Sequence, residues 1–323
     1  MKYNTIVFDC NNIYYRYYST RKEETYKVGS KTIVVGGIKG FLQHVEKMRE
    51  NFLVPGGKLI FGFDNQASKM NTRKEIDPGY KANRTEKAPV FYKSLEYLQL
   101  ILLNCYDGAE LLYRHSSEFD DMALPLIYQL PEKESVLIST NDMDFFRLID
   151  YKGRNIKIWD GKAVWDKNAF ADKYGFDPTS ESVVLYKSIR GDRSDNIDPA
   201  VEGFPKRLIV KAVENFGDVY TLLKHIEIFR EAEKGGWKER LYTARHKVKL
   251  NAQLVDFIQS EHEDISSYLH KCTFNAPSLS VLLSSLGFPD NYDGRVWQYT
   301  QNKKAKEQGL QDDFFVQPQV DRV

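Results

Sequence analysis

Carboxylate side chains recur in this sequence at the ends of short apolar segments. Nine of them directly follow such segments or stand in one polar loop: Asp9, Asp64, Glu118, Asp120, Asp121, Asp142, Asp144, Asp192 and Asp195. Like charges a few ångströms apart repel each other by kilocalories per mole, so acids that met at one place would need a positive partner. A single acidic residue is more often a helix cap, a turn residue or an exposed charge, so only the whole set points to a site.

Hard divalent cations are the partners that suit such a set. No histidine or cysteine accompanies the acids, so an all-oxygen site for Mg²⁺ or Mn²⁺ fits better than one for a softer metal. The number of acids suggests two ions, and a pair about 3.5–4 Å apart is the arrangement that activates water in phosphodiester cleavage. The alternative for Glu118, Asp120 and Asp121 is an ordinary first helical turn, in which acids complement the helix dipole.

The apolar segments predict a mostly parallel sheet. Runs rich in valine, isoleucine and phenylalanine indicate strands over 4–8, 58–63, 109–113, 135–140 and 156–159. Each run is separated from the next by enough chain for a helix, which is typical of an α/β fold. The expected helices cover 37–50, 89–105, 118–130 and 143–149. Ligands bind at the carboxyl ends of strands in such sheets, and most of the acids stand there.

After about residue 178 the pattern becomes helical. The stretch PKRLIVKAVENFG has apolar residues at helical spacing and ends at Gly217. We therefore expect an α/β domain over 1–180 and a helical subdomain over 181–290. A polar, flexible tail is expected over 301–323, because this segment lacks a core pattern.

The composition indicates a globular protein of the cytoplasm. Hydrophobic residues make up 42% of the 323 residues, which is ample for a packed core. The apolar run 98–105 is too short to span a bilayer, and the N-terminal segment lacks the features of a signal peptide. Cys10, Cys105 and Cys272 are too far apart in sequence for a metal knuckle. We expect a cytoplasmic monomer without membrane association or disulfides.

Two basic segments are candidates for nucleic-acid binding. Residues 65–93 carry seven basic and three acidic residues, which gives +4, with Tyr80, Phe91 and Tyr92 among them. Cations for phosphates and rings for bases, beside an acidic site, are what a strand of nucleic acid requires. Residues 224–249 also sum to +4, from eight basic and four acidic residues. For both segments the alternative is an ordinary exposed helix.

Three other motifs fit the sequence less well. DRSDNIDPAVEG begins like a calcium loop, but Ile197 stands where glycine is needed and Gly203 where a bidentate glutamate is needed. GSKT lacks the glycine-rich approach of a phosphate-binding loop. DMDFF is similar to the DxD of aspartyl phosphatases but accounts for none of the other acids. Nucleotide hydrolysis is therefore not expected.

Several segments resemble one family, the structure-specific 5′ nucleases, which includes flap endonucleases, polymerase-associated 5′–3′ exonucleases and phage ribonucleases H that remove primers. IVFDCNNIYYRYY and FGFDN are similar to its first two motifs, and DPGYKANR resembles its arch segment. EFDDMA resembles the ExDD signature, STNDMDFFRLI the strand-end DxD, and IRGDRSDNI the GDxxDN signature. The resemblance covers about residues 4–217.

The resemblance implies a PIN-like α/β fold with a C-terminal helix-hairpin-helix subdomain and two Mg²⁺ sites, which Mn²⁺ would also fill. The ligands mainly of the first ion would be Asp9, Asp64, Glu118, Asp120 and Asp121. Those of the second would be Asp144, Asp192 and Asp195, with Asp142 between the two sites.

The resemblance also implies roles beyond metal binding. Asp142, Lys81 and Arg84 would be catalytic, with the two cations on the scissile phosphate. Tyr80 would stack near the single-strand/duplex junction. The expected contacts to nucleic acid come from Arg73, Tyr80, Lys81, Arg84, Gly203, Lys206 and Arg207.

Two prolines depart from the family pattern. The hairpin that grips duplex backbone is normally Gly-x-Gly, and here Pro205 replaces the second glycine after Gly203. Proline has no N–H for a phosphate or to frame a K⁺ site, so the family's K⁺-assisted grip is weakened. Pro125 is expected to kink the helix over 118–130 or to end it early.

The tail carries a further motif. QGLQDDFF, residues 308–315, resembles the sliding-clamp peptide of cellular flap endonucleases. Its candidate contacts are Gln308, Leu310, Phe314 and Phe315. The alternative is a tail that folds back on the body of the protein.

Together these features predict a metal-dependent 5′ nuclease that hydrolyses phosphodiesters at 5′ flaps, nicks or RNA primers in DNA replication. Its substrates would be branched or 5′-ended DNA and RNA–DNA, and a sliding clamp or another replisome protein would be its partner. Two alternatives remain open. One is a PIN-type ribonuclease acting on single-stranded RNA, and the other is a structure-specific DNA-binding protein without catalysis.

Overall fold

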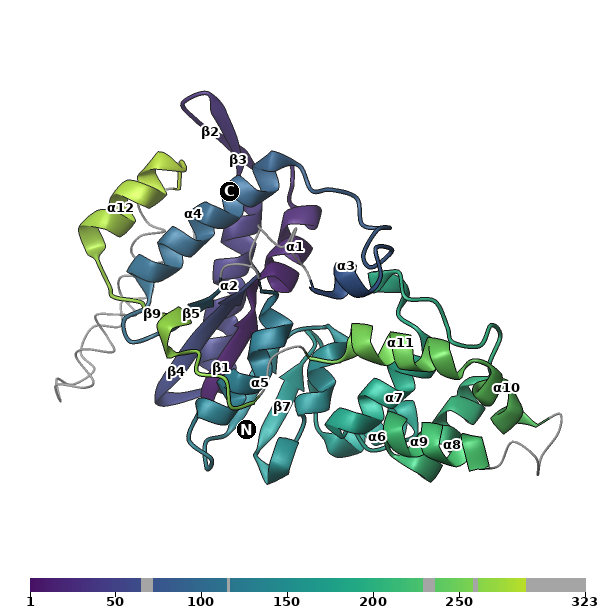
Figure 1. Cartoon of the computed structure of the whole chain (residues 1–323). Helices are drawn as coiled ribbons and strands as arrows, with labels where there is room; N and C mark the ends of the chain where they lie inside the picture. Colours follow the sequence, from purple (N-terminus) through teal and green to yellow (C-terminus); the bar gives the residue numbers. More distant parts are fainter. Residues whose placement is uncertain (65–71, 115–116, 229–235, 258–260, 289–323) are drawn as a thin grey trace, which may run out of the picture.

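A central sheet flanked by helices forms the body of the protein (Figure 1). The computed structural model describes residues 1–64, 72–114, 117–228, 236–257 and 261–288. Within these segments a seven-stranded sheet has the order β8-β7-β6-β1-β4-β5-β9. Its strands are β1 Tyr3–Asp9, β4 Leu53–Phe63, β5 Glu110–Tyr113, β6 Val136–Ser139, β7 Ile156–Trp159, β8 Val164–Trp165 and β9 Leu269–Lys271.

The inner strands of the sheet are parallel, and the two edge strands β8 and β9 are antiparallel to their neighbours. β1 lies at the centre between β4 and β6, and its successive residues face opposite layers. Ile6 and Phe8 pack into one core cluster and Val7 into the other, and all three are buried. The predicted strands over 4–8, 58–63, 109–113, 135–140 and 156–159 are confirmed.

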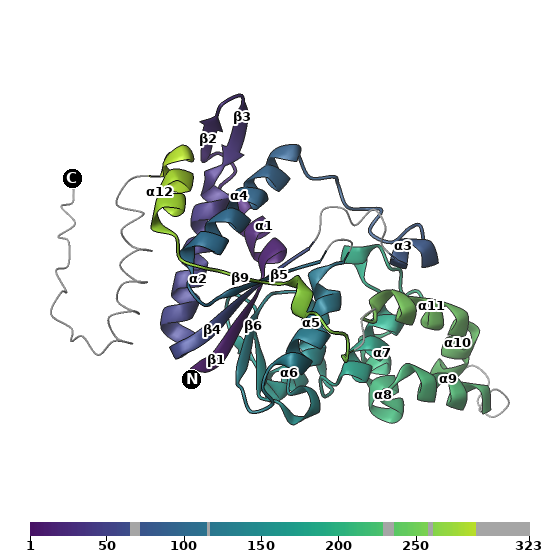
Figure 2. The same cartoon turned by 60° about the vertical axis from the view of Figure 1, so that its left-hand side comes forward.

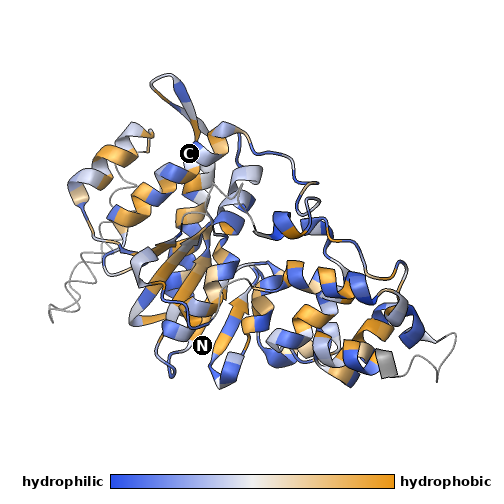
Figure 3. Cartoon of the chain, viewed as in Figure 1, coloured by the Kyte–Doolittle hydropathy of each residue, from blue (hydrophilic) through white to orange (hydrophobic). Residues whose placement is uncertain are grey.

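Helices cover both faces of the sheet, as Figures 1 and 2 show. One core cluster includes residues of α1 Cys10–Thr20, α2 Val35–Phe52, α4 Pro89–Cys105 and α12 Ala276–Ser285. The other includes residues of α5 Phe119–Gln129, the 3₁₀ helix η2 Met143–Leu148, α6 Lys167–Tyr174 and α7 Ser180–Arg190. The apolar strands and the mixed polarity of the surrounding helices are visible in Figure 3. Among the described residues, no helix is long and apolar enough to cross a bilayer.

The helical part of the chain lies beside this body (Figure 1). Its helices after α7 are α8 Lys206–Phe216, α9 Val219–Ile228, α10 Trp237–Thr243 and α11 Arg245–Val255. The short α3 Thr72–Ile76 packs against α11. Further 3₁₀ turns are η3 Tyr151–Gly153, η4 Arg193–Asp195 and η6 Ser266–Tyr268.

The structure differs from the predicted elements in several places, of which four matter most for the fold. An antiparallel hairpin of β2 Thr25–Val28 and β3 Lys31–Val34 was not predicted, because it is polar and mostly exposed. Strands do not end with β7, since β9 returns from the helical part and pairs with β5, bringing α12 onto α4. The predicted helix over 143–149 is the 3₁₀ helix η2. Pro125 does not end α5 early, because buried neighbours such as Leu126 and Ile127 hold the helix to Gln129.

A close approach between β4 and α5 brings two acidic segments together. Gly62 lies in β4 against the ring of Phe119, and a Cβ atom placed at Gly62 would stand only 2.0 Å from that ring. Phe119 is the first residue of α5 and lies between Glu118 and Asp120, while Asp64 follows two residues after Gly62. The absence of a side chain at Gly62 therefore sets how near these carboxylates lie.

Gly62→Ala should lower the free energy of unfolding by about 1–3 kcal/mol, because the added methyl group overlaps the Phe119 ring. Phe119→Leu in the same chain should recover part of this loss, since the smaller side chain makes room. Urea unfolding of the wild type, both single variants and the double variant measures this coupling. If the two substitutions changed the free energy of unfolding in a strictly additive way, the contact between Gly62 and Phe119 would not control the spacing of the carboxylates.

Candidate active site

Acidic residues from the ends of four neighbouring strands meet in one pocket of about 610 Å³. The carboxylates in its wall are Asp9, Asp64, Glu118, Asp120 and Asp142. Asp9 ends β1, Asp64 follows β4, Glu118 and Asp120 begin α5 after β5, and Asp142 follows β6. The sequence prediction that the strand ends bring acids together thus matches the geometry.

Hydrogen bonds from the neighbouring backbone and from Thr140 fix the carboxylates at the strand ends. Thr140 follows β6, and its hydroxyl donates to Asp9 Oδ2 over 2.7 Å and accepts from the N–H of Asp142 over 3.0 Å. Asp64 Oδ1 accepts from the N–H of Phe119 over 2.8 Å, which links β4 to α5. Asp142 in turn caps η2 by accepting from the N–H of Asp144. These bonds tie the ends of adjacent strands to one another.

The pocket carries more negative charge than its surroundings compensate. Burial, and then the neighbouring Asp64 charge, raise the pKa of Asp9 to about 8. Burial and Asp144 raise the pKa of Asp142 to about 6. Burial is also the largest cause of the raised pKa values of Asp64 and Asp120, followed by the charges of Glu118 and Asp121 respectively. Such shifts mean that the ionised carboxylates lack sufficient positive charge nearby.

Lys81 and Arg84 are two of the cations that line this pocket. Lys81 Nζ donates to both oxygens of Glu118 at 2.7 Å and lies 3.8 Å from Asp195 Oδ2. Arg84 pairs with Asp195 Oδ1 at 2.5 Å, while its side chain remains half exposed. Burial alone would lower the pKa of Lys81, but Glu118 and Asp195 raise it overall. Both predicted catalytic cations therefore lie at the site, bound to carboxylates.

A second acidic group lies next to the pocket. One carboxylate oxygen from each of Asp144, Asp192 and Asp195 lies within 4.8 Å of the others. Lys187 of α7 reaches into this group, pairing with Asp144 and with Asp192, the latter at 2.7 Å. Sequence reasoning missed Lys187, because a lysine in the apolar stretch VVLYKSI gives no sign that it turns toward distant acids.

Asp121, predicted as a metal ligand, has a protein partner in this structure. Both of its oxygens accept from Arg73, at 2.7 and 3.0 Å, and both side chains are almost fully buried. Arg73 also donates to the backbone carbonyl of Asp256 at the end of α11. Asp121 does lie near Glu118 and Asp120, within 4.8 Å of both. The bidentate pair makes Asp121 the counter-ion of Arg73 and leaves Arg73 no open face for nucleic acid.

Tyr80 is also placed differently from the prediction. Only 1% of the residue is exposed, and its hydroxyl donates to Asp195 Oδ2 over 3.0 Å. The ring packs among Val184, Ile197 and Leu254. It therefore has no free face for the base stacking that was predicted, because it fills a core between the segment after α3 and the helical part.

Of the predicted duplex contacts, Gly203 lines a hollow that continues from the pocket. This hollow, of about 760 Å³, reaches from Asp142 and Lys187 to Gly203. Gly203 adopts φ +64°, which favours glycine, and Pro205 directly precedes α8. Lys206 and Arg207 are exposed in the first turn of α8, and Lys206 donates to the carbonyl of Lys173.

The pocket wall also includes residues that sequence reasoning did not assign. Tyr15 of α1 is 47% exposed in the pocket wall, and Lys87 and Asn12 border the same space. The run of tyrosines after Asp9, in NNIYYRYY, was the available signal for Tyr15. The predicted partner residues Gln308, Leu310, Phe314 and Phe315 lie outside the described residues.

The donor set fits divalent cations of the Mg²⁺ class. All the candidate ligands are carboxylate oxygens, and the Oδ1 atom of Asn12 is buried with no hydrogen-bond partner in the described structure. Hard oxygen donors are the ligands that Mg²⁺ and Mn²⁺ prefer. The excess negative charge is what such ions would offset, so the residues present suit the predicted cofactor.

Asp121→Asn and Asp120→Asn should separate stability from metal binding. Breaking a buried ion pair from one side typically costs about 3–5 kcal/mol, so Asp121→Asn should lower the free energy of unfolding by that amount. It should leave Mn²⁺ affinity nearly unchanged. Asp120→Asn should weaken Mn²⁺ binding without loss of stability. Urea unfolding in the presence of a chelator measures stability, and calorimetric titration measures Mn²⁺ affinity. If Asp121→Asn weakened Mn²⁺ binding but left stability unchanged, Asp121 would not act mainly as the counter-ion of Arg73.

The raised pKa values predict a stability that depends on pH and Mg²⁺. Because the folded pKa of Asp9 is about 8, the folded protein retains a proton that the unfolded chain has released above about pH 4. Without divalent ions, the melting temperature should therefore fall as the pH rises from the unfolded pKa of Asp9 toward its folded pKa. Mg²⁺ should raise it more at pH 8 than at pH 6. Asp9→Asn should weaken the dependence of the melting temperature on pH and on Mg²⁺. An unchanged slope of melting temperature against pH in this variant would show that Asp9 is not the group responsible.

Known proteins similar to this chain include DNA polymerases I and a 5′–3′ exonuclease. The 5′–3′ exonuclease N-terminal resolvase-like domain matches residues 4–175. Thermostable DNA polymerase I of Thermus filiformis is 31% identical over 174 residues, which cover 53% of this chain and 20% of the polymerase. A 5′–3′ exonuclease of Buchnera aphidicola is 28% identical over 193 residues, covering 59% of this chain and 61% of that protein. The chain thus spans only about a fifth of that polymerase.

Solved structures share the fold. The flap endonuclease of bacteriophage T5, in a pseudo-enzyme-product complex with DNA and metal ions, superposes with a TM-score of 0.58 at 17% identity, covering 88% of this chain and 99% of that one. The catalytic core of Rad2 in complex with DNA substrate gives 0.53 at 13% identity, covering 91% of each chain. These matches confirm the predicted PIN-like fold. From the match over residues 4–175, the chain belongs to the 5′–3′ exonuclease family.

Proposed function

We propose that this protein is a metal-dependent structure-specific 5′ nuclease that hydrolyses phosphodiesters at 5′ flaps, nicks or RNA primers during DNA replication. The observation that supports this most is the pocket in which acids from four strand ends face Lys81 and Arg84. Carboxylates that gather divalent ions, with two cations opposite, suit a phosphodiester whose charge increases during cleavage. Among the residues that the structure describes, no histidine lines this pocket, and we expect no covalent intermediate with the protein.

The residues divide into two ligand groups. Asp9, Asp64, Glu118 and Asp120 would hold one Mg²⁺ or Mn²⁺ ion. Asp144, Asp192 and Asp195 would hold a second, with Asp142 between the two groups. Such ions, when bound, lower the pKa of water and neutralise charge on the leaving oxygen.

The chain's own cations position the phosphate. Lys81 and Arg84 reach into the pocket from the segment after α3 and would bind the scissile phosphodiester. Because Lys81 holds Glu118 and Arg84 holds Asp195 in this structure, these cations must exchange a carboxylate for the phosphate. Tyr15, exposed in the pocket wall, would present its ring to the adjoining base in place of the buried Tyr80.

The helical part would hold the duplex side of the substrate. The hollow that leaves Asp142 ends at Gly203, beside the exposed Lys206 and Arg207, which would contact backbone phosphates. The T5 flap endonuclease and the catalytic core of Rad2 were both solved with DNA, which supports DNA as the class of substrate. Pro205 removes one N–H, so we expect at most a weakened K⁺ site. Docking of a sliding clamp on Gln308, Leu310, Phe314 and Phe315 stays a prediction.

Asp142→Asn or Asp192→Asn should reduce Mg²⁺-dependent cleavage of a 5′-labelled flap by about a hundredfold or more, because each removes a group that supports charge stabilisation in the transition state. Asp198→Asn is the matched control, since the Asp198 side chain is 84% exposed and close in sequence. Single-turnover rates on a DNA flap, an RNA-primed nick and single-stranded RNA measure the effect. Near-normal cleavage by either variant, or a preference for single-stranded RNA, would contradict the proposal.

A further inference from the structure

The second group of candidate metal ligands comes from two separate pieces of chain. Asp144 lies in the 3₁₀ helix η2, which follows β6, whereas Asp192 and Asp195 belong to the loop that follows α7. Neither piece is a strand of the sheet, so the parallel strands alone do not set the distance between them. An element that contacts both pieces can set this distance, and α11 is such an element.

The C-terminal end of α11 holds η2 in place. Asp256 follows the last residue of α11, and its Oδ1 atom accepts from Arg147 Nη2 of η2 over 2.6 Å. Arg147 is only 4% exposed, and it also donates to the hydroxyl of Ser180, at the start of α7, over 2.7 Å. Its guanidinium lies 4.0 Å from the ring centre of Phe257. Because Arg147 stands three residues after Asp144 on the same short helix, fixing the guanidinium also fixes the turn that carries this ligand.

The middle of α11 holds the loop that carries the other two ligands. Asn251 is 2% exposed, and its side-chain Nδ2 donates to two backbone carbonyls. One carbonyl belongs to Ser188, in the last turn of α7 and 3.0 Å away, and the other to Asp198, 2.9 Å away. These two residues stand on either side of Asp192 and Asp195 in the chain. A single buried side chain of α11 therefore ties together both ends of the ligand loop.

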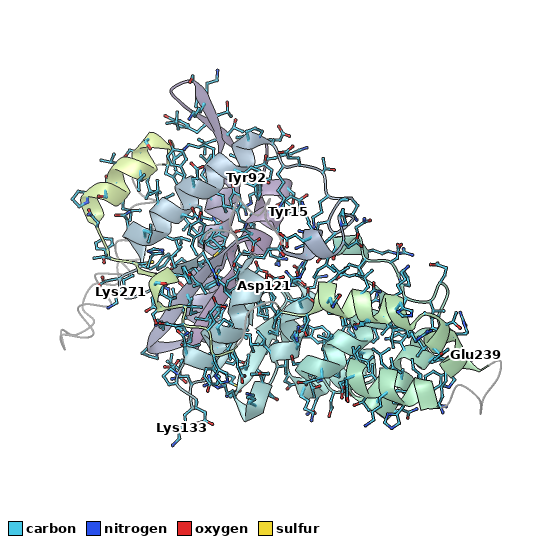
Figure 4. All side chains as sticks on the ribbon, viewed as in Figure 1. Tyr15, Tyr92, Asp121, Lys133, Glu239 and Lys271 are labelled. Atoms are coloured by element: carbon cyan, nitrogen blue, oxygen red, sulfur yellow. The ribbon has the colours of Figure 1, made fainter. Side chains whose placement is uncertain are left out.

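α11 is itself fixed against the body of the protein. The backbone carbonyl of Asp256 accepts from Arg73 over 2.9 Å, and Arg73 is held in turn by Asp121. Figure 4 shows Asp121 in the interior, where the body of the protein meets the helical part. α11 also packs against α3 and α7. Since the contact to Arg73 uses the backbone of Asp256 and the contact to Arg147 uses its side chain, a substitution at Asp256 can break the second contact alone.

We propose that α11 sets the geometry of the second metal-ligand group, with Asp256 and Asn251 as positioning residues. Asp256 acts on η2 through Arg147, and Asn251 acts through the backbone on the loop after α7. In the described part of the chain, neither side chain lines the carboxylate pocket or the hollow that leads to Gly203. Both therefore act from behind the ligands. The inference rests on the proposed nuclease function and adds to it what holds the site of the second ion together.

Asp256→Ala tests the proposal, because it removes the bond to Arg147 and keeps the carbonyl that Arg73 uses. Calorimetric titration should show Mn²⁺ binding weakened by about tenfold at one of two sites, as is typical when a group that orients metal ligands is lost. Asn251→Ala should weaken the same site. In flap cleavage, the half-saturating Mg²⁺ concentration should rise by a similar factor, and saturating Mg²⁺ should restore the rate. A merely structural defect would lower the melting temperature and leave this concentration unchanged.

A double-variant cycle identifies which of the two sites is affected. The losses of Mn²⁺ affinity in Asp256→Ala and Asp144→Asn should be less than additive, because both substitutions act on one ligand. The losses in Asp256→Ala and Asp120→Asn should add, since Asp120 belongs to the other group. The matched control is Asp264→Ala, which should leave Mn²⁺ affinity unchanged. Asp264 is an exposed aspartate of the following segment, and its side chain accepts from the N–H of Ser266.

Unchanged Mn²⁺ affinity in both Asp256→Ala and Asn251→Ala would overturn the proposal, and so would strictly additive losses with Asp144→Asn. If Asp256→Ala did not fold, Asp256→Asn would serve in the same cycle, because it removes the charge but keeps an acceptor for Arg147 and for the N–H of Phe257. If the wild type bound Mn²⁺ but cleaved no flap, the proposed function would fail. The calorimetric cycle would still decide whether α11 positions the ligands.

Discussion

Repulsion among carboxylates is the constraint on which the rest of the structure depends. The strand ends bring acids into one pocket where burial already disfavours their charges. Each cation that relieves this repulsion comes from elsewhere in the chain: Arg73 from α3, Lys81 and Arg84 from the segment after it, and Lys187 from α7. The acids therefore recruit the arch segment and the helical part to the end of the sheet, so the electrostatics of the site also organise the fold.

Asp195 is the point at which this coupling is most direct. Its backbone carbonyl accepts from the N–H of Lys81, and its carboxylate accepts from Tyr80 and Arg84. Lys81 and Asn196 both adopt positive φ, at 55° and 60°, a conformation that costs energy outside glycine and persists only where surroundings impose it. The strained backbone on both sides of this contact shows that the segment after α3 is held against the η4 loop. A predicted metal ligand thus also anchors the arch.

The sequence predicted what depends on local pattern and missed what depends on distant pairing. Asp9 and Asp64 were found because each directly follows an apolar strand, and parallel strands place their ends together. The partners Arg73 and Asp121 are 48 residues apart, and Tyr80 and Asp195 are 115 apart, so no periodicity relates them. Tyr80 was predicted to stack on a base because aromatic side chains among basic residues can do so. Such side chains can also pack in a core, as Tyr80 does here. β9 was not predicted because its three residues are too few to show the alternation of polar and apolar side chains that indicates a strand.

The pairing of Lys81 with Glu118 has a consequence for how the site becomes active. An ammonium that donates to both carboxylate oxygens cannot at the same time meet a phosphate in the same geometry. Under the proposed function, binding of divalent ions at Glu118 and release of Lys81 toward the substrate would be linked equilibria, and each would favour the other by the same free energy.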